Sequence, residues 1–211
     1  MTNAEIGPGE FYPVVGVGPH PKPWPTESHF DRELLENGDR RNVLDKYRYW
    51  SVSAIVADLD THRHQLQIAI ENWQHDLNIG SIVRTANAFN VSGVHIVGKR
   101  DWNKRGAMVT DRYLTVNHHA TVADFAAWCK ERNLPIIGID NVDGSKRLEG
   151  AQLPESCVLL FGQEGAGMSD EGIAACDVLY EIAQYGSTRS MNASAAGAIA
   201  MYHWALQHLP R

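Results

Sequence analysis

The stretch that decides the fold is Glu181–Tyr202, which reads EIAQYGSTRSMNASAAGAIAMY. It opens as a short apolar strand that ends near Ile182, and it closes as a helix of small residues, Ala193–Tyr202, that continues toward Leu209. A glycine loop and a cluster of Ser, Thr, Arg and Asn side chains lie between them. Ser and Asn at a helix start commonly cap free N–H groups. The whole arrangement also describes a pocket wall built from backbone, which suits a ligand with many polar edges.

The chain before this stretch alternates between strand and helix patterns. We expect strands at Leu66–Ile70, Gly93–Val97, Pro135–Ile139, Val158–Phe161 and Val178–Ile182, and helices at Asn78–Phe89, Val122–Arg132 and Asp170–Ala175. Such alternation predicts an α/β fold, a mainly parallel sheet with helices on both faces. Ligands of these sheets bind beyond the carboxyl ends of the strands.

Residues 1–65 have a different character from the expected core at residues 66–211. Gly7–Pro25 holds six of the nine prolines, so it should be extended or turned, with Phe11, Tyr12 and Trp24 packed onto another part of the protein. Short helices are expected at Phe30–Asn37 and Asn42–Trp50. The run from residue 39 to residue 50 interleaves cations with aromatics. It fits either RNA contact or a solvated face with partly buried rings.

Composition places the chain among ordinary globular proteins. Of its 211 residues, 44% are hydrophobic and 21% charged, and no apolar run approaches the ~20 residues of a membrane span. No secretory signal is visible, and three cysteines without C-x-x-C spacing predict a reducing cytoplasm and no zinc site. A net charge of −6 excludes a protein coated in positive charge but allows a local basic face.

Two more clusters follow expected strands. Asn78–Arg84 reads NIGSIVR, with Asn78 placed to cap a helix and Arg84 close to two turns later, near the same face. Arg84 then serves either a ligand or a structural ion pair. Phe161–Ser169 reads FGQEGAGMS, a loop whose glycines let backbone approach a ligand closely. It matches neither the Walker phosphate loop nor the dinucleotide fingerprint.

Three motifs together resemble one family. N-x-G-x-x-x-R at Asn78–Arg84, F-G-x-E-x-x-G at Phe161–Gly167 and S-x-N-x-S at Ser190–Ser194 are similar, in order and spacing, to the signature motifs of the SpoU (TrmH-type) branch of the SPOUT RNA methyltransferases. The resemblance covers roughly residues 66–209. It implies a C-terminal trefoil knot, a homodimer with the first motif near the subunit interface, and S-adenosylmethionine held between the second and third motifs. The residues implied at the cofactor are Phe161, Gly162, Gly167, Ile182, Met191 and Asn192.

The reaction implied is methyl transfer to a ribose 2′-hydroxyl of tRNA or rRNA, without a metal. Arg84 corresponds to the family's essential residue. Because a guanidinium keeps its proton up to a pKa above ~12, we interpret it as an electrostatic clamp on the developing oxyanion or a phosphate, rather than as a base. The resemblance implies that Asn78 orients Arg84 or the RNA, and that Glu164 anchors the loop or the partner's first motif. Ser190 and Asn192 would hold the ribose and order the cofactor loop.

The expected RNA-binding surface is a local basic one. Its residues are Lys99, Arg100, Lys104, Arg105 and Arg189, together with Arg112. A solvated loop is the alternative for residues 99–105.

The sequence departs from the family at two positions. Ala183 follows Ile182 where the family usually has Pro, which leaves the loop less fixed, and Met191 replaces a common Leu at little cost.

Two other functions stay open at this point. One is a non-catalytic RNA-binding module on the same fold, against which the intact motif residues argue. The other is a nucleotide-dependent oxidoreductase, against which the absence of G-x-G-x-x-G after the first strand argues.

Overall fold

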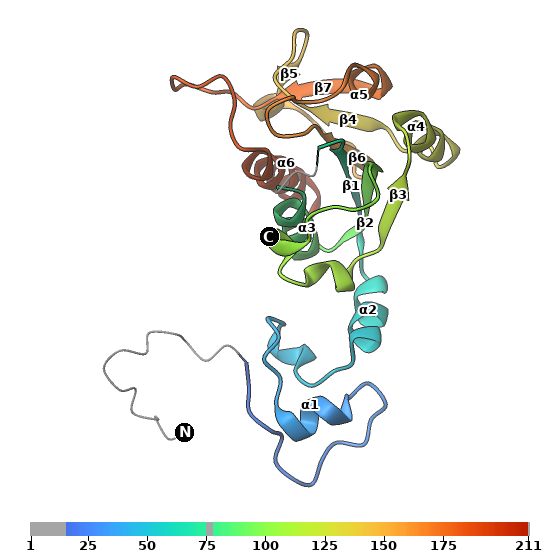
Figure 1. The fold of residues 1–211 in the computed structure, drawn as a ribbon, viewed down its shortest axis with the longest axis vertical. Helices are drawn as coiled ribbons and strands as arrows, with labels where there is room; N and C mark the ends of the chain where they lie inside the picture. Colours follow the sequence, from blue (N-terminus) through green and yellow to red (C-terminus); the bar gives the residue numbers. More distant parts are fainter. Residues whose placement is uncertain (1–15, 75–77, 211) are drawn as a thin grey trace. The chain divides into compact units, whose positions relative to one another are not determined.

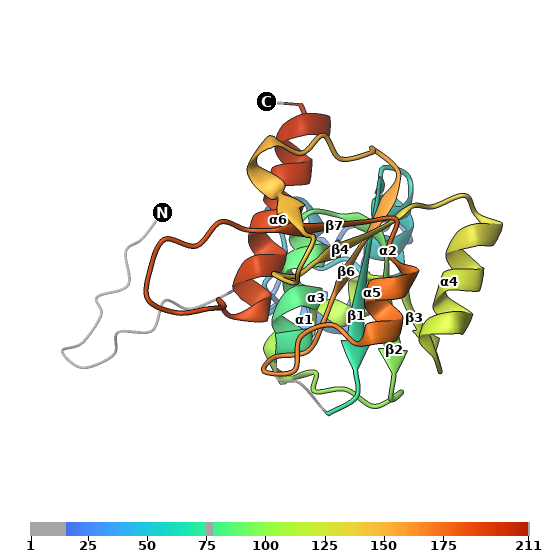
Figure 2. The same cartoon turned by 90° about the horizontal axis from the view of Figure 1, so that it is seen from above.

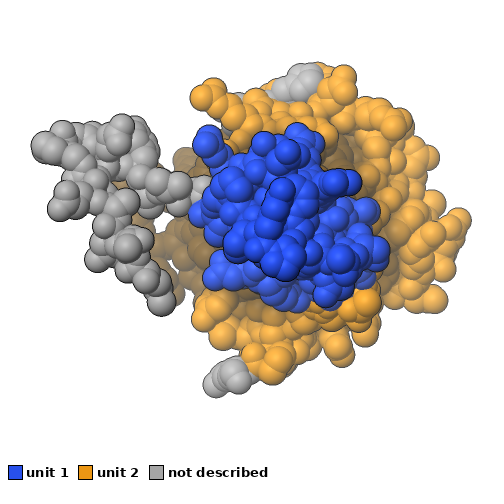
Figure 3. Space-filling view, turned by 90° about the horizontal axis from the view of Figure 1, so that it is seen from below, with its two compact units in different colours: residues 1–58 blue, residues 59–211 orange. Residues whose placement is uncertain are grey.

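The computed structural model describes residues 16–74 and 78–210, and it divides into two compact units, residues 1–58 and 59–211 (Figure 3). The division falls slightly before the boundary at residue 65 that the sequence predicts. The packing expected of Phe11 and Tyr12 lies outside the described residues. From residue 16 to Asp31 the described arm contains no helix, as its prolines predict.

The first unit is held by short elements and a buried ion pair. Its elements are α1 (Arg32–Asn37), the 3₁₀ helix η1 (Asp45–Tyr47) and the start of α2 (Val52–Asp60). Asp39 is fully buried, and Arg41 donates to both of its carboxylate oxygens, at 2.9 and 2.7 Å. Burial acts to raise the pKa of Asp39, but the bonds from Arg41 and Tyr49 outweigh it and lower the pKa to about 2.

The helix expected at Asn42–Trp50 is wrong in extent, because only η1 forms there. Tyr49 has φ of 63°, in the left-handed region, which a continuing helix cannot contain. The sequence reading also missed α2, although the Ser51 hydroxyl accepts from the Ala54 N–H at 3.2 Å as an N-cap would.

Three of the four cations of this run are paired with carboxylates, and Arg40 is exposed. Arg41 pairs with Asp39, Lys46 with Asp58 at 3.0 Å, and Arg48 with Asp45 at 3.6 Å. These pairs favour the structural interpretation of residues 39–50. A contact between this unit and RNA stays a prediction.

The second unit is a seven-stranded parallel sheet, counted within the described residues, with helices on both faces (Figures 1 and 2). The α/β prediction is therefore confirmed. The strand order is β3-β2-β1-β6-β4-β7-β5. The strands are β1 (His64–Asn72), β2 (Val91–Gly98), β3 (Val116–His119), β4 (Ile136–Ile139), β5 (Lys146–Arg147), β6 (Cys157–Phe161) and β7 (Val178–Glu181).

The helices are α3 (Asn78–Ala88), α4 (Val122–Glu131), α5 (Asp170–Ala175) and α6 (Ala193–His208), with 3₁₀ turns η2 (Arg105–Ala107), η3 (Thr110–Tyr113) and η4 (Leu148–Gly150). Helices α3 and α6 cover one face of the sheet, and α4 and α5 cover the other (Figure 2). Strands β3 and β5 were not predicted, because β3 reads as the polar Val-Asn-His-His and β5 has two residues. The trefoil knot stays a prediction.

Alternating side chains of β1 divide the core between the two faces. Ile68 and Ile70 pack with Trp204 of α6 on one face, while Ala69 packs with Phe125 of α4 on the other. Strand β6 is buried along its whole length, as expected for a central parallel strand. Its neighbour β4 lies between β6 and β7, so the carboxyl ends of these three strands meet at one edge.

Candidate active site

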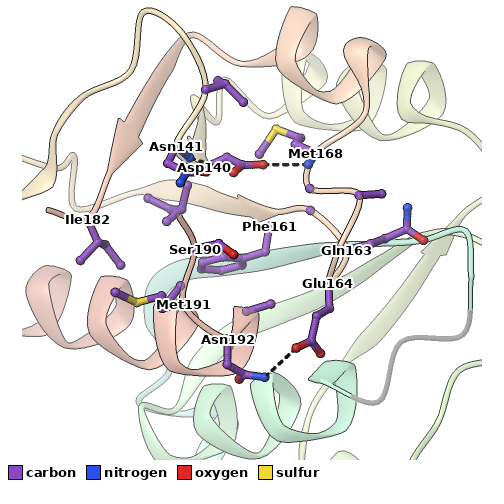
Figure 4. A pocket seen from close by; sticks show the side chains of 18 of the residues that line it. Asp140, Asn141, Phe161, Gln163, Glu164, Met168, Ile182, Ser190, Met191 and Asn192 are labelled. Atoms are coloured by element: carbon purple, nitrogen blue, oxygen red, sulfur yellow. Dashed lines mark hydrogen bonds between the residues drawn. The ribbon is translucent and has the colours of Figure 1, made fainter. Parts of the chain in front are cut away.

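A cavity of about 390 Å³ opens at the carboxyl ends of β4, β6 and β7 (Figure 4). Three segments line it, residues 139–142, 161–168 and 182–196. The six residues expected at the cofactor all lie in its wall: Phe161, Gly162, Gly167, Ile182, Met191 and Asn192. This is where a parallel α/β sheet binds its ligands.

The glycine loop after β6 is closed on itself by backbone. Gln163 and Gly167 exchange both N–H···O bonds, each 3.0 Å long. A Cβ on Gly162 would lie 2.2 Å from the Met168 nitrogen, so a side chain cannot fit without moving the loop. Gly167 has φ of 72°, which favours glycine. The loop therefore presents backbone to the cavity.

Asp140, which the sequence reading missed, ties this loop to β4. Its carboxylate accepts from the Met168 N–H at 2.7 Å and from the Asn141 N–H at 2.8 Å. It also lines the cavity, where its charge favours a ligand with hydroxyl or cationic groups. The signal in the sequence was its position, the first polar residue after the apolar run Ile136–Ile139.

One hydrogen-bonded cluster joins the three motifs. Asn192 donates through Nδ2 to Glu164 Oε1 at 3.3 Å (Figure 4) and to Asn78 Oδ1 at 2.8 Å, and Asn78 also donates to Glu164. The Asn192 Oδ1 accepts from the Ser194 N–H at 3.0 Å and so caps α6. Capping and pocket building are thus combined in one side chain.

Asn78 lies inside the helix, one position later than the N-cap position at which it was expected. It is the first residue of α3, not a residue that caps the helix from outside, and its side chain turns toward the other two motifs. The family-derived position is therefore brought to the site, although the capping argument for it was wrong.

The side chain of Arg84 does not point in the same direction as that of Asn78. Asn78 is buried while Arg84 is exposed, because six residues at 3.6 per turn rotate a side chain by about 240° from the first, not back to the same face. The prediction that Arg84 lies near the face of Asn78 is wrong. Arg84 lies outside the cavity wall and has no hydrogen bond or ion pair within the described residues. The alternative of a structural ion pair is therefore not supported by that part of the chain.

The third-motif loop is anchored by side chains from two other segments. The Arg189 carbonyl accepts from the side-chain amides of Asn141 and Gln184, and the Ala183 N–H donates to Glu149 Oε1 at 2.8 Å. A proline at residue 183 has no N–H to donate, so this chain holds the loop by a hydrogen bond where the family usually has proline. Ser190 is exposed and lies in the cavity wall.

The expected RNA-binding cations lie outside this cavity. Lys99, Arg100, Lys104 and Arg105 are exposed in the segment after β2, and Arg189 is exposed in the third-motif loop. Lys104 pairs with Asp111 at 3.0 Å and is therefore partly neutralised.

Other chemistries find little support in the described part of the chain. No three His, Cys, Asp or Glu side chains there are grouped to hold a metal ion, and none of the helices described is long and apolar enough to cross a membrane. The three cysteines are free, and burial raises the pKa of each thiol to about 12, which keeps them unreactive near neutral pH.

The fold and the cavity define a parallel α/β protein with a cavity lined partly by backbone and with three distant motifs joined beside it. The SpoU rRNA Methylase family model matches residues 65–202, and the chain belongs to this family.

Two named relatives come from bacteria. The tRNA (guanosine(18)-2′-O)-methyltransferase of Escherichia coli is 28% identical over 140 residues, which span 65% of this chain and 61% of that enzyme. The 23S rRNA (guanosine-2′-O-)-methyltransferase of Neisseria meningitidis serogroup B is 28% identical over 195 residues, 81% of this chain and 74% of that enzyme.

Solved structures share the fold. The TrmH/SpoU tRNA modifying enzyme of A. aeolicus superposes with a TM-score of 0.65 at 22% identity, covering 74% of this chain and 81% of that one. The SpoU methyltransferase AviRb of Streptomyces viridochromogenes, solved with its cofactor AdoMet, gives 0.63 at 23% identity, covering 72% and 61%.

Proposed function

We propose that the protein transfers a methyl group from S-adenosylmethionine to a ribose 2′-hydroxyl of tRNA or rRNA. The observation that carries the proposal is the hydrogen-bonded cluster of Asn78, Glu164 and Asn192 beside the cavity. The names of the bacterial relatives, 2′-O-methyltransferases of tRNA and rRNA, support the same chemistry.

The cavity fits the cofactor in size and character. Its apolar surface comes from Phe161, Ile182 and Met191, its backbone edges come from the glycine loop, and Asp140 adds an acceptor for a hydroxyl or ammonium group. Bound there, S-adenosylmethionine supplies an electrophilic methyl on a sulfonium. Ser190 and Asn192 border the same space, and we assign them to order the cofactor loop and hold the ribose.

The accepting hydroxyl loses its proton as it attacks, so its oxygen develops negative charge. We assign stabilisation of that charge, or of an adjacent phosphate, to Arg84. Its guanidinium holds its proton too tightly to act as a base. Because Arg84 does not line the cavity of its own chain, it would serve the cavity of a second copy.

A homodimer through α3 and α6 is therefore part of the proposal. Ile199, Tyr202 and Leu206 form an exposed apolar stripe along α6, which packs beside α3. Spacings of three and four residues put these side chains on one face of the helix. Such a stripe is suited to burial against a second copy.

The place of action we propose is the cytoplasm, because the proposed substrates are tRNA or rRNA and the cysteines are free.

Three measurements test the proposal. Calorimetry with a chelator present should show S-adenosylmethionine binding, and loss of binding on chelation would contradict the metal-free site. Radiolabelled methyl transfer to tRNA and rRNA, followed by mapping of 2′-O-methyl positions, should identify the substrate. Cofactor and RNA binding without transfer would instead establish a non-catalytic module. Light scattering that gives a stable 23.4 kDa monomer at micromolar concentration would overturn the dimer.

A further inference from the structure

We propose that a second pocket, beside β2 and β3, binds an unpaired nucleotide of the RNA substrate that carries an exocyclic amine. The inference rests on the proposed function and adds a site for a nucleotide other than the one methylated. The pocket has a volume of about 300 Å³, at the small end of the range for ligand sites. Ile96 and Val116 line it from the strands, and Arg100, Trp102, Lys104 and His118 supply its cationic and aromatic groups.

These side chains match the parts of a nucleotide. Arg100 is exposed and has no ion pair or hydrogen bond within the described residues, so its guanidinium is available to a phosphate or to a base face. Trp102 is partly buried and packs against the hydrophobic core, which makes its ring a fixed platform for stacking. Ile96 and Val116 add apolar surface beside the ring.

Hydrogen bonds hold the loop of this pocket in place before any ligand binds. Asn72 is fully buried, and its Nδ2 donates to the Lys99 carbonyl at 2.7 Å and the Asp101 carbonyl at 2.9 Å. Lys104 lies over the Trp102 ring at 5.4 Å and pairs with Asp111, so its exposed side chain would swing aside when a base stacks on the ring. Because the loop is fixed on both sides of Arg100, binding would require little ordering.

The acceptors of the pocket indicate which bases fit. His118 lies 2.8 Å from the Gly98 carbonyl through Nε2, and since a carbonyl only accepts, Nε2 is the donor there and Nδ1 is the ring nitrogen that can accept a hydrogen bond from a ligand. Asp101 also lines the pocket. An exocyclic amine of guanine, adenine or cytosine offers two N–H donors to these acceptors, whereas uracil offers only its single ring N3–H, so the pocket favours a base with an amine.

The location lets one RNA strand reach both pockets. β2 and β4 belong to one parallel sheet, with β1 and β6 between them, and a strand spacing of about 4.8 Å puts them about 14 Å apart. The loop carrying Arg100 and Trp102 leaves the carboxyl end of β2, and the cofactor cavity lies at the carboxyl end of β4. Stacking on Trp102 requires a splayed base, so the nucleotide is unpaired.

The test uses the full chain and a short single-stranded oligoribonucleotide that contains 5-iodocytidine. Irradiation followed by mass spectrometry should place the adduct on Trp102. Fluorescence anisotropy should show that Arg100→Gln weakens binding about tenfold and lowers the slope of log K against log salt by about 0.7. An all-uridine oligomer should bind more weakly than a cytidine oligomer. Lys130→Gln removes one exposed charge on α4, on the other face of the sheet, and should change neither quantity.

Adducts mapped only elsewhere, with Arg100→Gln binding as the wild type does, would overturn the proposal. Equal binding of uridine and cytidine oligomers would overturn the base preference. The outcome is separable from that of the proposed function. Arg100→Gln should leave S-adenosylmethionine affinity unchanged, and a Trp102 adduct on a chain that transfers no methyl would support this pocket while the methyltransferase proposal fails.

Discussion

The cofactor cavity and Arg84 belong to the same proposed site but are built in opposite ways. The cavity wall is tied together by Asp140, Asn192 and the closed glycine loop, so its shape is set within one chain. Arg84 is exposed and bonded to nothing within the described residues. The cavity wall is therefore built within one chain, whereas in the proposed function Arg84 would act only together with a second chain or the RNA.

This difference separates the two kinds of effect that a substitution can have. Residues of the cavity should act on cofactor affinity, because they shape the ground-state complex. Arg84 should act on the rate alone, because it meets charge that develops only in the transition state.

The largest effect is expected from Arg84→Ala. It should lower the single-turnover rate by about 10²–10³, the usual size for one donor to an oxyanion, and leave cofactor affinity unchanged. Arg84→Lys should rescue little, because a point charge does not copy the planar fork. Single-turnover kinetics with separate cofactor calorimetry measures both. A near-normal rate for Arg84→Ala would make the residue structural.

Gly162→Ala should impair the cofactor cavity. The new Cβ would lie 2.2 Å from the Met168 nitrogen and 2.3 Å from the Gly167 carbonyl carbon, both backbone atoms that cannot swing away. Overpacking of this kind costs about 1–3 kcal/mol, so cofactor affinity should fall by roughly 5- to 150-fold. Gly186→Ala is the matched control, since its Cβ meets nothing within 4 Å. Unchanged calorimetry for Gly162→Ala would show that the loop does not hold the cofactor.

The sequence predicted the central strands and helices better than the edge strands and the polar residues of the cavity, for physical reasons. The periodicity of apolar residues predicts the strands and the small-residue helix, and α5 and the start of α6 lie where they were expected. Polar edge strands such as β3 and β5 carry no such signal. Asp140 was missed because a single acid after a strand resembles any turn residue.

The orientation of Arg84 was mispredicted although its helix was right. Its place on α3 follows from the pattern, but the direction of its side chain depends on the helical rotation from Asn78. Six residues fall well short of two full turns, so the two side chains do not share a face. The meeting of Asn78 with Glu164 and Asn192 could not be predicted from local pattern at all, since these residues lie 86 and 114 positions away. Only the family resemblance brought them together.

Asn192→Asp should separate the two roles of that side chain. The carboxylate keeps the cap on α6, so the contribution of the cap to the free energy of unfolding should hold, but it removes the Nδ2 donor and faces Glu164 with a like charge. Cofactor affinity should fall about tenfold, because a buried acceptor loses its partner. Asn192→Ala, in contrast, should lose about 1 kcal/mol of stability as well. If Asn192→Asp binds the cofactor normally, Asn192 serves only as the cap of α6.

The smallest effect concerns a region outside both halves, the buried histidine pair under α4. His95 lies 2.9 Å from His119 and 2.7 Å from the Gln67 Oε1, and burial favours the neutral form of both rings by lowering their pKa values. Burial, and then the neighbouring His119, lower the pKa of His95 to about 3. An unfolded chain binds a proton there below about pH 6.5 that the folded chain refuses, so folding stability is lost as the pH falls from that value toward about 3.

Urea unfolding between pH 7 and pH 5 should show this loss as a slope of about 1.4 kcal/mol per pH unit below pH 6.5. The range stays above the window in which Asp39, with its pKa lowered to about 2, would begin to contribute. His95→Gln removes one of the two titrating rings and should lessen the slope, since burial also lowers the pKa of His119. His118→Gln changes an exposed neighbour, leaves the pair in place and should keep the wild-type slope. A wild-type slope in His95→Gln would show that other groups set the acid sensitivity. Cofactor affinity measured above pH 6.5 should stay the same in both variants, because the pair lies on the face of the sheet opposite α3 and α6.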